Sequence, residues 1–530
     1  MAKLELLLGG LKSTMNRMLL CTSGGKRINF KLWHKRSWMS GGITKCCNMG
    51  IWRYASRVNS RYSGCAMSIV EARRLGDNFE FLNIGSTMTY IASPMRGLRF
   101  KDKPKLFWLF GLFPALFLSD ILYGGLDYFG IHTPVSPGIV MRGFVFFLAI
   151  VMVAKYRRRL DTLTLAWCIS LVIFSLPSII VGMWTGGNLI TDFLGLLKVL
   201  YGPFVILLVV ILIRKYRIPF NDVLRFIEYS AYLLGISLLI SLKLTINRAT
   251  YGEWAFGSTG IFSAQNDITL AFGLSLLAAI YRLVVLKVSL KNLLIRLTCL
   301  AVSLYACIQI GTRGSLIVIF GCGIFSVVVM LWSKKSSAIK KTYSRHMKWL
   351  LVLALSLGMG WILMYGLNMQ RQHSFQQEKL ANLYELKLPR SYLMDAGWKQ
   401  IVTRPGWMNL TGEGMTSFGL GVSGYFRGLY RSEKKLVEVD WMDFLGAYGI
   451  FFTILIHLFF LWVLWRAAWE YVTGSKDPLC GLVATASAMY LGHSAFAGHA
   501  LISPIPTTLI AGYVGVYLVM RKDKDRVHAA

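Results

Sequence analysis

Two apolar runs separated by a very short link make up the stretch NLLIRLTCLAVSLYACIQIGTRGSLIVIFGCGIFSVVVMLW, residues 292–332. Each run has about 20 residues, enough for a helix to cross the roughly 30 Å hydrocarbon core of a bilayer. In lipid, only helices and closed barrels satisfy all of their backbone polar groups. The link Gly311–Gly314 contains Arg313. The stretch therefore predicts a membrane-spanning helical hairpin with an arginine at its tip.

The same pattern recurs through most of the chain. Its 530 residues are 55% hydrophobic and only 16% charged, with a mean hydropathy of +0.52, which excludes an ordinary soluble domain. The sequence predicts an all-α, polytopic integral membrane protein with about 12 transmembrane helices and a large external loop between helices 9 and 10. The expected spans are 106–125, 136–154, 162–183, 190–213, 224–246, 268–286, 293–310, 314–332, 349–367, 441–465, 480–498 and 503–520.

Basic clusters follow every second predicted span and explain most of the net charge of +33. Lysine and arginine in short loops mark the cytoplasmic side of a membrane protein. We therefore expect both termini in the cytoplasm and no nucleic-acid partner. The clusters are KYRRRL at 155–160, RKYR at 214–217, KKSSAIKKTYSRHMK at 334–348 and RKDKDR at 521–526, and RFKDKPK at 99–105 precedes the first span.

The chain divides into four predicted parts. Residues 1–100 form a basic N-terminal region, 101–367 hold transmembrane helices 1–9, 368–440 form an external (periplasmic) loop domain, and 441–530 hold helices 10–12 and a cytoplasmic tail. Two interpretations of the first part remain open. It is either a disordered basic tail that touches anionic lipid, or it is not translated, with synthesis starting at Met67, Met88 or Met95.

The external loop carries a helical signal of its own. LPRSYLMDAGWKQIVTRP, residues 388–405, predicts a helix that starts after Pro389 and ends before Pro405. A glycine-rich stretch follows it. A loop this long is usually functional or disordered.

The nine cysteines show no CxxC pair and no Cys/His spacing typical of metal ligands. Four of them, Cys168, Cys299, Cys307 and Cys322, lie in predicted spans, where cysteine usually behaves as a small apolar residue. We expect no disulfide framework, no metal and no cofactor.

Arg313 lies at the external end of its hairpin if the basic loops are cytoplasmic. One interpretation is a snorkelling arginine, whose apolar stem lies along the membrane while its guanidinium reaches the membrane–water interface. The other is an anion clamp, because the planar guanidinium matches phosphate oxygens.

A second polar stretch, FGSTGIFSAQNDITLAFGL at 256–274, enters a predicted span from the same side. Asn266 or Asp267 could simply cap the helix. Alternatively, Gln265, Asn266 and Asp267 line an outward-facing pocket beside Arg313, with Thr312 as its neighbour.

These segments resemble motifs of the O-antigen ligase and polymerase superfamily. GSTGIFSAQND is similar to the family's helix entry, and GTRGSLI is similar to its Ser-Arg-Gly turn, with Thr312 where serine is usual. RSYLMDAGWKQIVTRPGWMNLTGEGMTSF resembles its external-loop run, and VEVDWMDFLGAYGIFFTIL resembles the element leading into the next span. The four motifs stand in the family's order over residues 256–455.

The resemblance implies a glycosyltransferase that uses a sugar donor linked to undecaprenyl pyrophosphate and needs neither metal nor nucleotide sugar. It implies a bacterial inner-membrane enzyme whose site faces the periplasm and whose substrate is a lipid-linked oligosaccharide. The implied partners are the surrounding membrane lipids, a flippase and a chain-length regulator. The leaving pyrophosphate gains charge as the glycosidic bond breaks, so fixed cations should stabilise the transition state. By motif position these cations are Arg313 and Arg390, with Arg404 as a third and more exposed candidate.

A glycosyl transfer also needs a base for the acceptor hydroxyl. Ligases of the resembled family are expected to carry a histidine before the span that follows the loop, whereas this chain has Glu438, Asp440 and Asp443 there. The departure favours the polymerase branch, with these three acids as catalytic candidates. They could instead pair with Lys434 and Lys435. Of the two histidines His493 and His499, we expect a structural or acceptor-lining role, and His499 is the next candidate for the base.

Three functions are therefore compared. The first is a polysaccharide polymerase for O-antigen, capsule or exopolysaccharide, and the second is a ligase that attaches glycan to another acceptor. The third is a polysaccharide transporter or flippase, which should show related halves and interrupted helices. The sequence shows no such repeat.

Overall fold

The computed structural model describes residues 103–131, 136–244, 249–251, 256–258, 260–262, 265–285, 290–310, 312, 318, 321–322, 325, 389–425, 436–473, 477–496 and 498–529. The chain separates into two units, Met1–Gly97 and Leu98–Ala530. The account below concerns the second unit. Predictions for residues 1–100 lie outside the described residues.

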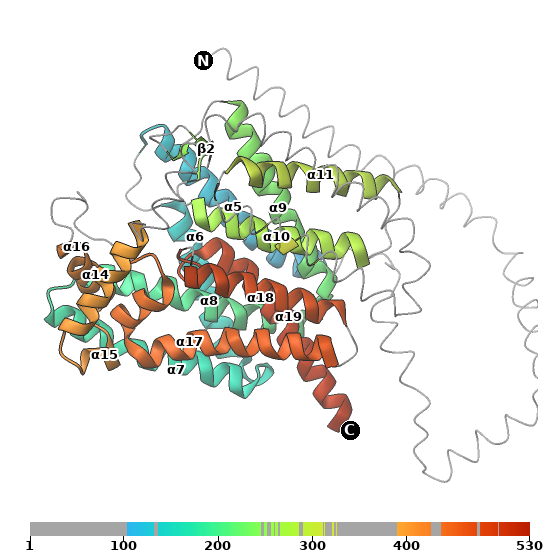
Figure 1. The fold of residues 1–530 in the computed structure, drawn as a ribbon. Helices are drawn as coiled ribbons and strands as arrows, with labels where there is room; N and C mark the ends of the chain where they lie inside the picture. The colour runs from blue at the N-terminus through green and yellow to red at the C-terminus, as the bar shows by residue number, and fades with distance from the viewer. Residues whose placement is uncertain are drawn as a thin grey trace, which may run out of the picture. The chain divides into compact units, whose positions relative to one another are not determined.

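The described part is almost entirely helical (Figure 1). Its elements are α5 (Lys103–Tyr128), α6 (Pro137–Tyr156), η2 (Arg157–Arg159), α7 (Thr162–Trp184), α8 (Leu189–Tyr216), α9 (Phe220–Lys243), β1 (Ala249–Tyr251), β2 (Phe256–Ser258), α10 (Gln265–Val285), α11 (Leu290–Gln309), α14 (Pro389–Thr403), α15 (Met408–Thr411), α16 (Met415–Gly424), α17 (Asp440–Thr473), α18 (Pro478–Phe496) and α19 (Pro504–Ala529). The two strands form one short antiparallel hairpin, in which Ala249 pairs with Ser258 and Tyr251 with Phe256.

Several of these helices can cross a bilayer. Among the described residues, six are long and apolar enough: α6 with η2, α7, α8, α9, α17 and α18. The chain is therefore an α-helical, multi-pass membrane protein. Ten of the twelve predicted spans overlap described helices. Of the other two, 314–332 is described only at residues 318, 321, 322 and 325, and 349–367 lies outside the described residues.

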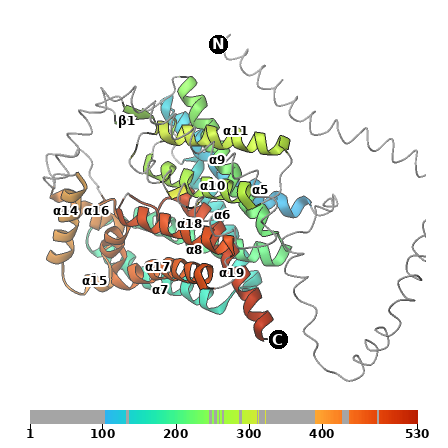
Figure 2. The same ribbon diagram turned by 45° about the vertical axis from the view of Figure 1, so that its right-hand side comes forward.

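Helix α8 forms the centre of the bundle. Residues 205–213 are buried on every side, as expected for a helix that is apolar all round and surrounded by other helices. It packs against α6, α7 and α19 (Figures 1 and 2). By contrast, α6, α7 and α17 expose large apolar side chains such as Phe147, Ile173 and Leu458, which suits helices that face lipid.

Helix α17 is interrupted near its start. Gly449 has φ 81°, a left-handed conformation that glycine adopts without steric cost. A Cβ at this position would lie 2.2 Å from the carbonyl oxygen of Leu410, so the loop that carries α15 packs directly on the break. The break frees helical carbonyls just before it, which then need other donors.

The external loop is described at residues 389–425 and from 436 onwards. The helix that the sequence predicts after Pro389 is α14, which ends two residues before Pro405. Helices α14, α15 and α16 gather at one end of the bundle, beside the start of α17 and away from the C-terminal end of α19 (Figures 1 and 2). A small apolar core, which includes Leu393, Ile401 and Phe418, joins this loop to Met442 of α17.

Candidate functional site

His499 and two aspartates meet where α17 begins and α18 connects to α19. The His499 Nδ1 atom lies 3.6 Å from Asp440 Oδ1 and 3.6 Å from Asp443 Oδ2. Both aspartate side chains are fully buried, whereas the His499 side chain is 26% exposed. The imidazole is therefore the member of this group that a ligand can reach.

Backbone hydrogen bonds fix the two aspartates. Asp443 accepts hydrogen bonds from the N–H groups of Val437 at 2.9 Å and Glu438 at 3.1 Å. These bonds fix the backbone that leads into α17. Asp440 accepts from Leu501 N–H at 2.8 Å and so ties the α18–α19 connection to the same place. Glu438 itself has φ 66° and is half-buried just outside the helix.

The carboxylates determine the charge of His499. Burial lowers the pKa of this imidazole, but the interaction with Asp440 and the negative charges of Asp443 and Asp267 outweigh burial and raise the pKa to about 9. His499 is therefore a cation at neutral pH, able to hold an anion or to donate a proton.

The start of α10 completes the cluster. The Asp267 carboxylate interacts electrostatically with Ser503, four residues after His499, and its charge acts on that imidazole. Two residues further along, Thr269 Oγ1 lies 3.1 Å from Thr312 Oγ1. The entry to α10 and Thr312 are thereby placed beside the α18–α19 connection.

Arg404 is not the exposed loop residue that the sequence suggested. Its side chain is 3% exposed, and the guanidinium donates to the carbonyl oxygens of Gly446 at 2.7 Å and Leu445 at 3.0 Å. It also donates to Asn409 Oδ1 at 2.8 Å and forms an ion pair with Glu413 at 3.4 Å. The expectation of exposure is wrong because the break at Gly449 leaves carbonyls that this guanidinium satisfies.

Burial perturbs both members of this ion pair. It lowers the pKa of Arg404 and raises the pKa of Glu413, while each partner opposes the shift of the other. Gln400 Nε2 also donates to Glu413 at 3.1 Å. The Arg404–Glu413 pair is therefore a structural link between the external loop and α17.

The other candidates are only partly described. Arg313, Lys434 and Lys435 lie outside the described residues. Arg390 lies in the first turn of α14 and Gln265 in the first turn of α10, and only their backbone is described. Asn266 is half-buried in the first turn of α10. The roles predicted for Arg313 and Arg390 stay predictions.

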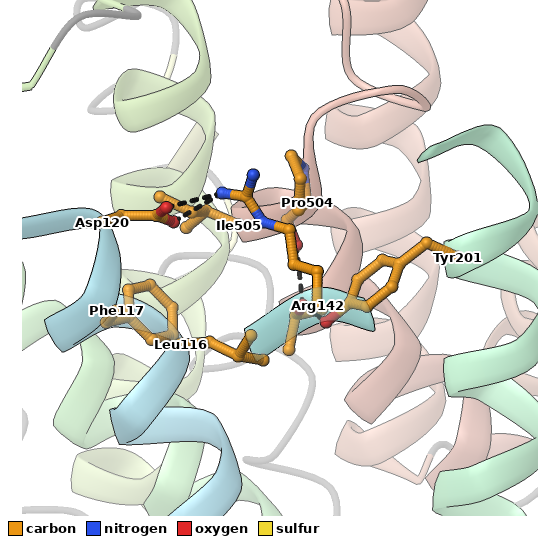
Figure 3. A pocket seen from close by; sticks show the side chains of 8 residues that line it. Leu116, Phe117, Asp120, Arg142, Tyr201, Pro504 and Ile505 are labelled. Carbon is orange, nitrogen blue, oxygen red and sulfur yellow. Dashed lines mark hydrogen bonds and ion pairs between the residues drawn. The ribbon is translucent and has the colours of Figure 1, made fainter. Parts of the chain in front are cut away.

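A second ion pair, which the sequence analysis missed, lines a narrow pocket close to this cluster (Figure 3). Arg142 Nη2 of α6 donates to both carboxylate oxygens of Asp120 of α5 at 2.7 Å. The pocket is also lined by Leu116, Phe117, Tyr201, Pro504, Ile505 and Thr508. The available signal was a single charged residue within each apolar run, which marks a functional site by default.

Within the described ranges, no group of three or more His, Cys, Asp or Glu side chains is arranged to hold a metal ion. Comparison with protein-family models, curated proteins and solved structures finds no match.

Proposed function

We propose that this protein is a membrane polysaccharide polymerase. It transfers a glycan from undecaprenyl pyrophosphate to a lipid-linked oligosaccharide repeat unit at the outer face of the bacterial inner membrane. In this reaction the acceptor hydroxyl forms a new bond to the anomeric carbon and loses its proton to a base. The bond from that carbon to the pyrophosphate oxygen breaks, and pyrophosphate leaves with the electron pair.

The observation that carries this proposal is the convergence of the segments that resemble the family motifs. Three interactions bring three such segments to one place: the Asp440–His499 contact, the electrostatic interaction of Asp267 with His499, and the Thr269–Thr312 hydrogen bond. The fourth segment packs on the start of α17 through Arg404. Chemistry on a lipid-linked donor needs reactive groups at helix ends near the membrane surface, and these segments meet at helix ends.

The exposures of the residues suggest their roles. His499 is charged and partly exposed, so it can stabilise the leaving pyrophosphate together with Arg313 and Arg390. Asp440 and Asp443 are buried behind it and act as positioning residues that keep it charged. Glu438 is half-buried at the entry to α17 and is the proposed proton acceptor.

The proposed topology has twelve spans, with both termini inside. The loop helices α14–α16 and the cluster lie toward the end of the bundle away from the end of α19, an arrangement that agrees with a site facing the periplasm. A flippase that supplies the repeat unit and a chain-length regulator are the expected protein partners.

The test is the lipid-linked glycan pool of a deletion strain. Single repeat units should accumulate, and wild-type protein should restore polymer. Glu438→Gln and His499→Gln should fail to restore it at normal protein level, whereas Asp395→Asn, at an exposed loop carboxylate, should succeed. Normal polymer in the deletion strain contradicts the proposal. Polymer that forms but is not transferred to its final acceptor indicates the ligase instead.

One observation favours a transporter as the second candidate. The interruption at Gly449 and the ion pairs within spans are features of transporters. In proteoliposomes, a transporter moves lipid-linked repeat units between leaflets without lengthening them. Chain extension by the purified protein excludes this alternative.

A further inference from the structure

Asp192 is a buried carboxylate where the external loop meets the membrane helices. It lies in the first turn of α8 and is 2% exposed. Over it lies the connection Gly412–Glu413–Gly414, which leads into α16, and beside it lies the turn from α7 to α8. The residue takes no part in the proposed transfer reaction.

Only one of its two oxygens is satisfied. Asp192 Oδ1 accepts from Thr416 N–H at 2.6 Å, at the N-terminus of the ten-residue helix α16. Asp192 Oδ2 is buried without a hydrogen-bond partner. Across the described ranges of the chain, Asp192 forms no ion pair. A buried carboxylate oxygen without compensation is costly.

Other oxygens gather around the same place. A Cβ atom added to Gly187 would lie 2.7 Å from Gly182 O, 2.8 Å from Asp192 Oδ2 and 2.8 Å from Ser417 Oγ. A Cβ atom added to Gly182 would lie 2.9 Å from Asp192 Oδ2 and 3.2 Å from Glu413 O. Oxygens from α7, α8 and the loop therefore surround a region that the glycines keep free of side chains.

The hydroxyl groups there supply too few hydrogens. Thr185 Oγ1 lies 2.7 Å from Ser417 Oγ, 3.1 Å from Val181 O, 3.2 Å from Gly182 O and 3.4 Å from Glu413 O, yet it has one hydrogen to donate. Ser417 has one more, 3.3 Å from Gly182 O. Tyr448 Oη is buried without a hydrogen-bond partner too. Backbone N–H groups serve two of these carbonyls, since Thr185 donates to Val181 O at 3.0 Å and Gly187 donates to Gly182 O at 2.7 Å. Asp192 Oδ2 is left without a donor.

We propose a binding site here for a small monovalent cation, sodium. Its ligands are the Asp192 carboxylate, Gly182 O, Glu413 O and the hydroxyl groups of Thr185 and Ser417. Hard cations select carboxylate, carbonyl and hydroxyl oxygens. A single positive charge balances the single carboxylate, whereas a divalent ion would leave a buried net charge. The ligands come from the end of α7, from α8, from the loop before α16 and from α16 itself, so the bound ion fastens the external loop to the membrane bundle. The inference is independent of the proposed function.

The test is the thermal stability of the purified full-length protein in detergent, with sodium chloride or choline chloride at equal ionic strength. Sodium should raise the Tm by several degrees in a saturable way, because a ligand that binds only the folded state stabilises it. Asp192→Asn should abolish the dependence, while Asp395→Asn should retain it. Ser417→Ala, which keeps the carboxylate, should shift the sodium midpoint several-fold upward.

Direct binding of ²²Na⁺ gives a second readout. Wild-type protein should bind about one ion per chain, and Asp192→Asn should bind none. Equal Tm values of the wild-type protein in sodium and choline, or sodium binding that survives Asp192→Asn, would overturn the proposal. If Asp192→Asn does not fold, an unchanged sodium midpoint in Ser417→Ala overturns it equally.

Discussion

Replacing Arg404 by methionine should loosen the external loop from α17. The guanidinium donates to Gly446 O at 2.7 Å and Leu445 O at 3.0 Å, carbonyls that the break at Gly449 leaves without helical partners. Methionine keeps much of the side-chain volume but donates nothing. It leaves the 5%-exposed Glu413 carboxylate without its charged partner, although the Gln400 amide still donates to it. Breaking a buried pair from one side typically costs about 3–5 kcal/mol, and we expect an effect of this size.

Limited proteolysis and thermal unfolding in detergent measure this effect. The variant should be cleaved between α14 and α16 much faster than wild-type protein and should unfold at a lower temperature, because local opening of the loop becomes easier. Lys399→Met is the matched control, since Lys399 forms a surface ion pair with Asp395 and both side chains are more than half exposed. It should cost about 1 kcal/mol or less.

A double variant separates the two possible roles of Arg404. Arg404→Met combined with Glu413→Gln removes both charges and should recover part of the stability that Arg404→Met loses. The reasoning is refuted if Arg404→Met resists protease and heat like wild-type protein but makes no polymer. Arg404 would then contact the pyrophosphate, as the sequence first suggested.

Three further predictions concern His499, Gly449 and the topology. The pKa of His499 is raised by its interaction with Asp440 and Asp443, so this interaction stabilises the folded protein while the imidazole is charged. The contribution is about 3 kcal/mol below pH 6.5 and is lost as the pH rises through about 9. The Tm should therefore fall over that window. His499→Gln should flatten this fall, and an unchanged pH profile in the variant contradicts the assigned charge. Gly449→Ala should lower the free energy of unfolding by about 1–3 kcal/mol, because Gly449 has φ 81° and a Cβ there would meet the Leu410 carbonyl oxygen. Gly143→Ala is the control: a Cβ at Gly143 in α6 meets open space, so this variant should be neutral or stabilising. Equal Tm values for the two variants would disprove the strained break. Asp395→Cys should react with an impermeant thiol reagent in intact spheroplasts and Arg158→Cys should not, and labelling in the opposite sense would invert the topology.

The positions of the helices were largely predictable because length and hydropathy are local properties of the chain. The ranges predicted for the spans overlap α5–α11 and α17–α19, and α14 was visible from the prolines at 389 and 405. The charged residues within apolar runs, Asp120, Arg142 and Asp192, were also visible, although which partners they meet was not. A single charge in such a run signals a site but does not name its partner.

The contacts of the candidate site depended on the tertiary structure. Asp440 and Leu501 are 61 residues apart in the sequence, and only the packing of α17 with α18 and α19 brings the carboxylate to that backbone N–H and to His499. Arg404 lies between the end of a predicted helix and Pro405 in the external loop, a position that indicates a solvated charge. Its burial follows from a helix break at Gly449, where a left-handed residue leaves carbonyls that must find donors. Hydropathy therefore determined which segments enter the membrane, while the need to satisfy buried polar atoms, which can be assessed only in three dimensions, determined which side chains meet.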